Sequence, residues 1–286
     1  MTHLKNFWFS YSNILLNEIY KKNILKLLKK TLGIPYKFFL RYLRHNFSKK
    51  IINLDNIDKL NFSKCSLDKL FVHFNCDKGS SCIANDKKIS THNYSIFYEK
   101  YLSNLKEKKI NILEIGSHEG KGIASFYFYF PYSKIIGANI NPFQMKFKSK
   151  RITELFINVS SKKIIKNFSD HIKVDQDIII DDASHNLRDI LFTLSILFKK
   201  LKSGGLYILE DMNQFHVFPE LNPFKNELTP KQIFNRIKEK KTFKSSFISD
   251  EEKNYLIENI KEIKIETGAM KINNANVSDI AFIFKR

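Results

Sequence analysis

The sequence predicts an α/β fold with a seven-stranded, mostly parallel sheet, an antiparallel C-terminal hairpin and a helical N-terminal extension. Two observations predict it. Between residues 110 and 209, short apolar runs alternate with stretches of helical periodicity, which is typical of parallel strands covered by helices on both faces. Near the C-terminus, two further β-rich runs flank a polar loop, which favours an antiparallel pair.

Seven segments are expected to form the strands. The alternating region supplies residues 110–115, 135–140, 155–159, 177–180 and 206–209, and the closing hairpin supplies residues 261–266 and 279–284. A helix over residues 95–106 leads into the first strand. A second helix, over residues 184–201, has clear limits, because Ser184 is a suitable N-cap and Gly204 and Gly205 follow its end.

Length and composition favour one large domain with an appendage. The chain has 286 residues and 43% hydrophobic content, so we assign residues 62–286 to the domain and residues 1–61 to the extension. Without a long uncharged apolar run or a secretory signal pattern, we expect a soluble, cytoplasmic protein. The net charge of +19 indicates an anionic partner, such as nucleic acid, a membrane surface or a phosphorylated substrate.

The N-terminal extension is strongly basic. The first 60 residues hold 12 Lys and Arg against three acidic residues. Residues 13–32 predict an imperfect amphipathic helix, ended by Gly33 and Pro35 and followed by a basic segment over residues 38–50. One interpretation places this helix on a partner or at the inner face of an anionic membrane. The other packs it on the rest of the chain, with its lysines in solvent.

Three cysteines, Cys65, Cys76 and Cys82, match neither a disulfide framework nor the paired spacing of zinc ligands. His73 and His92 are near enough in sequence to keep zinc as an alternative. Free or buried thiols in a reducing compartment are the simpler interpretation.

The segment over residues 111–122 predicts a cofactor-binding turn. Its strand ends in Glu114, which can accept hydrogen bonds from a cationic ligand, and Gly116 permits positive φ and close backbone approach. The second strand ends at Asn139, where Rossmann-like nucleotide-binding folds usually have an acid that bonds ribose hydroxyls. The turn lacks the G-x-G-x-x-G spacing that seats a pyrophosphate, so S-adenosylmethionine is favoured over NAD.

Four carboxylates follow two neighbouring strands, and they are Asp181, Asp182, Glu210 and Asp211. The carboxyl ends of parallel strands meet at one edge of the sheet, so these groups should converge. Converging carboxylates repel one another unless a cation joins them, and oxygen ligands suit Mg²⁺ or Mn²⁺. In the alternative interpretation each acid caps a helix or pairs with a lysine.

Together these segments resemble the metal-dependent sugar O-methyltransferases that tailor macrolide and related antibiotics, which are similar in layout to catechol O-methyltransferases. The resemblance covers about residues 67–213, with a looser match in the C-terminal hairpin. The matching pieces are Asp77-Lys-Gly79, His92-Asn-Tyr94, Tyr98-Glu99, Leu113-Glu-Ile-Gly116, Asp181-Asp-Ala-Ser-His185 and Gly204-Gly-Leu-Tyr-Ile-Leu-Glu-Asp211.

The resemblance implies three groups of site residues. The implied metal ligands are Asp182, Glu210 and Asp211. The implied general base is His185, with Asp182 as the next candidate for this catalytic role. The implied contacts to S-adenosylmethionine are Glu114, Gly116, Asn139 and Asp181. The sequence departs from the family pattern twice, at Asn139 and at Asn158-Val-Ser-Ser161, which stands where the family tends to show Asp-Gln.

We therefore expect methyl transfer from S-adenosylmethionine, with Mg²⁺ or Mn²⁺, to a sugar hydroxyl of a glycan or a glycosylated small molecule. A nucleic-acid methyltransferase is favoured by the net charge, but the acidic cluster would repel phosphates and no nucleic-acid-binding module is recognisable. A catalytically silent protein that binds the cofactor or a glycan in glycan assembly is the other alternative, supported by the two departures.

Overall fold

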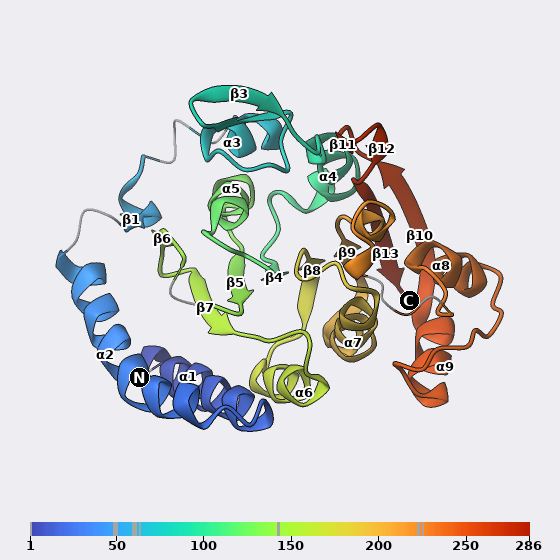
Figure 1. The fold of residues 1–286 in the computed structure, drawn as a ribbon. Helices are drawn as coiled ribbons and strands as arrows, with labels where there is room; N and C mark the ends of the chain where they lie inside the picture. The colour runs from blue at the N-terminus through green and yellow to red at the C-terminus, as the bar shows by residue number, and fades with distance from the viewer. Residues whose placement is uncertain are drawn as a thin grey trace.

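A seven-stranded sheet organises the computed structural model, which describes residues 2–47, 51–58, 62, 64–141, 144–221, 224 and 226–286. The strand order is β10-β13-β9-β8-β4-β5-β7 (Figure 1). The strands are β4 (Asn111–Ile115), β5 (Lys134–Asn139), β7 (Ile152–Phe156), β8 (Gln176–Asp181), β9 (Leu201–Leu209), β10 (Ile260–Thr267) and β13 (Asp279–Lys285).

The pairing confirms the predicted fold class. Strands β7, β5, β4, β8 and β9 are parallel, whereas β13 pairs antiparallel with both β9 and β10. The strand predicted over residues 155–159 begins earlier, at Ile152, and ends at Phe156. Small two-stranded pairs lie outside this sheet: β1 (Ile52–Asn53) with β6 (Phe147–Lys148), β2 (Ser81–Ala84) with β3 (Lys87–Ser90), and β11 (Lys271–Ile272) with β12 (Ala275–Asn276).

Two helical layers cover the sheet. One contains α3 (Leu67–His73), α4 (Ser95–Leu102) and α5 (Lys121–Tyr129), and the other contains α6 (Lys162–His171), α7 (Leu187–Leu197), α8 (Pro230–Lys238) and α9 (Asp250–Asn259) (Figure 1). Successive strand residues face opposite layers, so Ile112 joins the first core and Leu113 the second. This two-sided burial explains why the strands are apolar throughout.

The helix predicted over residues 184–201 is shorter than expected. Asn186, not Ser184, is the N-cap of α7, and its side chain accepts a hydrogen bond from the backbone N–H of Arg188. After one 3₁₀ turn the chain enters β9 at Leu201, so Gly204 and Gly205 lie inside a strand. Ser184 instead donates from its hydroxyl to Asp189.

The N-terminal region forms two helices, α1 (Thr2–Tyr20) and α2 (Ile24–Phe47), where one helix over residues 13–32 was predicted. The prediction that Gly33 and Pro35 end a helix is wrong. Pro35 cannot donate to the carbonyl of Thr31, four residues earlier, but the hydroxyl of Tyr11 donates to that carbonyl at 3.0 Å. The orphaned acceptor is thereby satisfied, and α2 continues through the proline.

Helix α1 lies against β7, the edge strand of the sheet, and against α6. The backbone N–H of Phe156 in β7 donates to the hydroxyl of Ser10 in α1, at 3.1 Å. Among the described helices, none is long and apolar enough to cross a membrane. Residues 48–50 of the second basic segment and residues 59–61 at the predicted domain boundary lie outside the described residues, so that boundary stays a prediction.

Candidate active site

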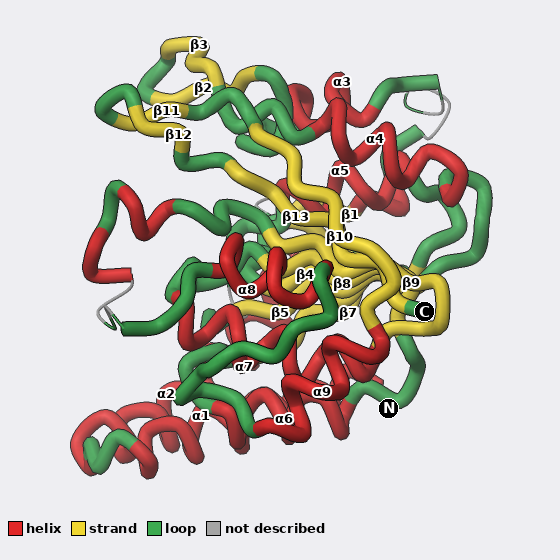
Figure 2. Tube along the Cα trace, turned by 90° about the vertical axis from the view of Figure 1, so that its right-hand side faces the viewer, coloured by secondary structure: helices red, strands yellow, loops and turns green. Residues whose placement is uncertain are grey.

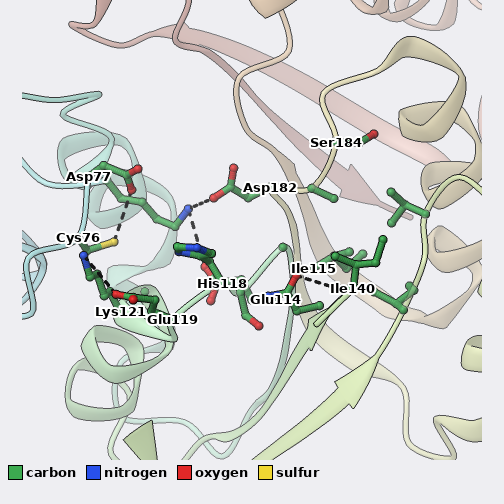
Figure 3. A pocket seen from close by; sticks show the side chains of 18 of the residues that line it. Cys76, Asp77, Glu114, Ile115, His118, Glu119, Lys121, Ile140, Asp182 and Ser184 are labelled. Atoms are coloured by element: carbon green, nitrogen blue, oxygen red, sulfur yellow. Dashed lines mark hydrogen bonds and ion pairs between the residues drawn. The ribbon is translucent and has the colours of Figure 1, made fainter. Parts of the chain in front are cut away.

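A cavity of about 770 Å³ opens at the carboxyl ends of β4, β5 and β7. Its size suits a cofactor or a small ligand. Four of the predicted site residues line it, namely Glu114, Gly116, Asn139 and Asp182 (Figure 3). The predicted cofactor turn is therefore part of a cavity wall, at the sheet edge where α/β folds bind ligands.

Gly116 is required by the fold at this turn. Its φ is +88°, and a Cβ atom built there would lie 1.8 Å from the backbone carbonyl oxygen of Asp182. No side chain fits at that separation. The backbone of the cofactor turn therefore packs directly on the backbone that presents Asp182, and the two parts of the site are fixed to each other.

Glu114 is buried at the end of β4 beside the cavity. Burial raises the pKa of its carboxyl to about 7, although Lys78 acts to lower it. A Cβ atom on Gly122 of α5 would lie 2.6 Å from Glu114 Oε1, so the helix approaches this carboxylate closely because residue 122 has no side chain. Glu114 Oε2 has no hydrogen-bond partner among the described residues, which leaves it available to a cationic ligand.

The two departures from the family pattern lie on the same cavity. Asn139 Oδ1 accepts from the N–H of Ile140 at 2.8 Å, and its amide contacts Gln144. The amide nitrogen of Asn158 donates to Asn17 Oδ1 of α1 at 2.7 Å. Asn158 also lines the cavity, so the N-terminal region touches the cavity wall directly.

Lys78 occupies the centre of the acidic cluster. Its Nζ lies 2.5 Å from Asp182 Oδ2, 2.5 Å from Glu210 Oε2 and 3.7 Å from Glu114 Oε1. Burial alone would lower the pKa of this ammonium, but Asp182 and Glu210 raise it well above its ordinary value. Tyr98 donates from its hydroxyl to the other oxygen of Glu210. The sequence predicts that a metal ion balances the negative charge of these carboxylates. In the structure, Lys78 balances part of that charge.

Asp182, His185 and Asp211 form a second group, in which one ligand atom of each lies within 4.8 Å of the others. The two carboxylates of this group offer the oxygen ligands that Mg²⁺ and Mn²⁺ prefer. The structure thus brings together two of the three predicted metal ligands, with His185 beside them. Glu210, the third, faces Lys78 and Tyr98 instead.

Asp211 is held from two sides. The hydroxyl of Tyr94 donates to Asp211 Oδ1 at 2.5 Å, and Gln214 donates to Oδ2 at 2.7 Å. His92 Nδ1 lies 3.1 Å from Oδ1 without the alignment of a hydrogen bond. Burial raises the pKa of Asp211, but His92, His185 and the hydrogen bond from Tyr94 lower it, and the net shift is downward. Asp211 and His185 both have positive φ, a strained conformation that concentrates at functional sites.

The expectation for Asp181 is corrected by the structure. Its side chain points away from the cavity, where Thr193 and Tyr207 donate to Oδ2 at 2.5 and 2.7 Å. Burial raises the pKa of this carboxyl to about 6. Successive residues of a strand face opposite sides, so Asp181 and Asp182 cannot both face the cavity. Asp181 joins α7 to β9 and does not contact the cofactor cavity.

Sequence reasoning gave no role beside the acidic residues to four of their partners, namely Lys78, His92, Tyr94 and Tyr98, and considered His92 only as a zinc ligand. They all come from the segment before β4, which crosses the carboxyl edge of the sheet. Only the family motifs Asp77-Lys-Gly79, His92-Asn-Tyr94 and Tyr98-Glu99 pointed to them. The zinc alternative finds no support, since the metal-compatible group found among the described residues contains no cysteine.

Known proteins similar to this chain are sugar O-methyltransferases. It is 26% identical over 132 residues to the 8-demethyl-8-alpha-L-rhamnosyl tetracenomycin-C 2'-O-methyltransferase of Streptomyces olivaceus, which covers 44% of this chain and 34% of that protein. It is 26% identical over 156 residues to the L-olivosyl-oleandolide 3-O-methyltransferase of Streptomyces antibioticus, covering 51% and 36%. The matches thus span about a third of each relative. No protein-family model matches the chain.

Among solved structures, MycE methyltransferase from the mycinamycin biosynthetic pathway, in complex with Mg, SAH and mycinamycin VI, superposes with a TM-score of 0.59. Sequence identity is 18%, and the match covers 78% of this chain and 55% of that one. The fold is that of a methyltransferase. This methyltransferase fold confirms the predicted class, and the sequence matches confirm the resemblance to sugar O-methyltransferases.

Proposed function

We propose that the protein transfers the methyl group of S-adenosylmethionine to a sugar hydroxyl of a glycan or a glycosylated molecule, with the help of a divalent cation. One observation carries this proposal: Asp182 lines the cofactor-sized cavity and also belongs to the cluster with His185 and Asp211. A methyl donor bound in the cavity and an acceptor bound at the cluster would therefore lie next to each other, beside Asp182.

The cavity would bind the cofactor through Glu114, Gly116 and Asn139. The Glu114 carboxylate would accept hydrogen bonds from the ammonium group of the cofactor, and the turn at Gly116 would let the protein backbone approach the ligand closely. The Asn139 amide can form hydrogen bonds with the two ribose hydroxyls. S-adenosylmethionine, when bound, supplies an electrophilic methyl group on a sulfonium.

Asp182 and Asp211 would hold the divalent cation, because Mg²⁺ and Mn²⁺ prefer oxygen ligands. A bound cation supplies positive charge that favours loss of a hydroxyl proton from the acceptor. Glu210 would contribute to the negative charge of the site indirectly, through its ion pair with Lys78. The related MycE structure in complex with Mg and SAH supports this choice of ion and cofactor.

His185 would remove the acceptor proton. Its Nε2 lies 3.8 Å from Asp182 Oδ1, so it is beside the carboxylate that would help to place the acceptor. We assign the imidazole to proton transfer, and not to the metal, because the two neighbouring carboxylates already provide oxygen ligands.

The remaining parts of the proposal concern the N-terminal region and the setting of the protein. We take residues 1–61 as an extension of a methyltransferase domain over residues 62–286. We further propose a cytoplasmic protein whose extension touches the inner face of a membrane.

Methyl transfer from labelled S-adenosylmethionine to deoxysugar-bearing macrolides and to cell-envelope glycan precursors tests the proposed reaction. Product mass identifies the acceptor. We expect turnover with Mg²⁺ or Mn²⁺ and none in EDTA. The second candidate, a silent binding protein, rests on Asn139 and Asn158, and it predicts cofactor binding by calorimetry without turnover on any acceptor. Full turnover in EDTA would contradict the metal assignment.

A further inference from the structure

The outward face of α2 carries a stripe of large apolar side chains, which we call the α2 stripe. Their exposed fractions lie between 59% and 81%. At about 100° per residue they occupy an arc of roughly 120°, and none of the charged residues of α2 falls inside it. The α2 stripe consists of Ile24, Leu25, Leu28, Leu32 and Tyr36.

The opposite face of α2 is already occupied. Ile34 is buried in a cluster with Phe7 and Ile14 of α1, and Lys30 forms an ion pair with Glu18 of α1 at 2.6 Å. The hydroxyl of Tyr11 in α1 fixes the backbone at Thr31. Helix α2 is therefore anchored through α1, and the α2 stripe faces away from the protein core.

Lysines border this stripe on one side. Lys22, Lys26 and Lys29 are exposed, and α2 contains six Lys and Arg but no Asp or Glu. An apolar face bordered by lysines is the pattern of helices that lie in the interface of a membrane. A symmetric contact between two copies of this face would bring lysines of like charge together, whereas anionic headgroups complement them.

The start of the α2 stripe lies near the cavity. The turn between α1 and α2 follows Asn17, which bonds to cavity-lining Asn158. Tyr20, at the end of α1, lies under the ammonium of Lys163 in α6, at 4.8 Å. In Figure 2 this turn and β2, whose residues also line the cavity, both lie on the left, beyond the same edge of the sheet.

We propose that the α2 stripe inserts into the interfacial layer of an anionic membrane while the lysines contact lipid headgroups. Binding in this way brings the rim of the cavity close to the lipid surface. The inference rests on the exposed side chains of α2 and is independent of the proposed methyl transfer. Large exposed apolar patches on protein surfaces mark sites of contact with a membrane or with another protein.

Flotation of the full chain with vesicles tests the proposal. The vesicles contain phosphatidylcholine alone or with roughly 30% phosphatidylglycerol. We expect binding to the anionic vesicles that weakens as salt rises from about 0.1 to about 0.5 M. The variant Leu28→Ser/Leu32→Ser should reduce partitioning at least about tenfold. The variant Lys26→Gln/Lys29→Gln should reduce it by roughly tenfold on anionic vesicles only.

The matched control is Ile96→Ser/Val174→Ser, which removes two exposed apolar side chains elsewhere on the surface. Its partitioning should equal that of the original chain. Circular dichroism and thermal melting should be unchanged in all variants, because the altered side chains are exposed. Equal partitioning of the stripe variant and the control would overturn the proposal. A second outcome would also overturn the proposal: the original chain is a dimer in light scattering, the stripe variant is a monomer, and neither binds vesicles. The α2 stripe would then be the contact with a second copy of the chain.

Discussion

Lys78 Nζ lies 2.5 Å from Asp182 Oδ2, and the same buried ammonium group also pairs with the buried carboxylates of Glu210 and Glu114. Glu114, which we propose to bind the cofactor, and Asp182, which we propose to bind the metal, thus share one cation. This contact makes the stability of the fold and the charge of the site depend on the same side chain.

Replacing Lys78 should destabilise the protein strongly. Lys78→Met leaves buried carboxylates without their cation, and breaking a buried ion pair costs about 3–5 kcal/mol. Chemical denaturation would measure the loss in free energy of unfolding, and Glu210→Gln added to Lys78→Met should recover part of it. Unchanged stability of Lys78→Met in metal-free buffer would refute this role of the lysine.

Glu114 should make cofactor binding depend on pH. Burial raises the pKa of its carboxyl to about 7, so the group is largely protonated below that pH and ionised above it. A cationic cofactor requires the ionised form, so affinity should rise with pH through about 7, by up to tenfold per pH unit below it. Calorimetry at several pH values measures this. Glu114→Gln should bind more weakly and lose the pH dependence; a pH profile identical to the original would speak against the assignment.

Asp211 should control metal affinity. Asp211→Asn removes one charge from the two carboxylates assigned to the cation, so Mn²⁺ affinity should fall at least about tenfold. Titration followed by electron paramagnetic resonance measures it without any assay of turnover. The exposed Asp250→Asn serves as the control and should bind Mn²⁺ as the original chain does. Equal affinities of the two variants would move the metal site elsewhere.

His185→Ala should lower turnover by about two to four orders of magnitude, because general-base catalysis contributes that much. Affinities for cofactor and metal should stay nearly constant, since we assign the metal to Asp182 and Asp211 and not to His185. Turnover within about threefold of the original would reject His185 as the base and make Asp182 the next candidate.

Gly116→Ala should damage the fold as well as cofactor binding. The new Cβ would lie 1.8 Å from the carbonyl oxygen of Asp182, at a φ of +88° that disfavours alanine. We expect a clear fall in melting temperature, and Gly33→Ala provides the comparison because nothing lies near its Cβ position. Equal melting temperatures for the two variants would contradict this role of Gly116 in the fold.

The sheet could be predicted from the sequence because each central strand is buried on both faces and therefore apolar throughout. The positions of Glu114, Asp182 and Asp211 followed from the same reasoning, since they lie at or just after the carboxyl ends of neighbouring parallel strands. The partners of the acids could not be found this way. Lys78 and Tyr98 lie in a preceding segment, and no periodicity links that segment to the sheet edge.

The N-terminal helices show a different limit of sequence reasoning. Pro35 is a strong local signal for a helix end, and the structure overrides it through a contact with Tyr11, which is 20 residues from Thr31. Asp181 and Asp182 show another, because adjacent acids in a motif look equivalent in the sequence, whereas the alternation of a strand sends them to opposite sides.

The hydroxyl of Ser10 accepts a hydrogen bond from an N–H group of β7 that no neighbouring strand can reach. An open strand edge is a template on which another chain can add a strand, and proteins with uncovered edges tend to aggregate. Helix α1 therefore covers the edge of the sheet at β7 and prevents another chain from adding a strand there. Removing α1 would expose this edge of the sheet, so a shortened chain should self-associate even where each remaining strand is correctly folded.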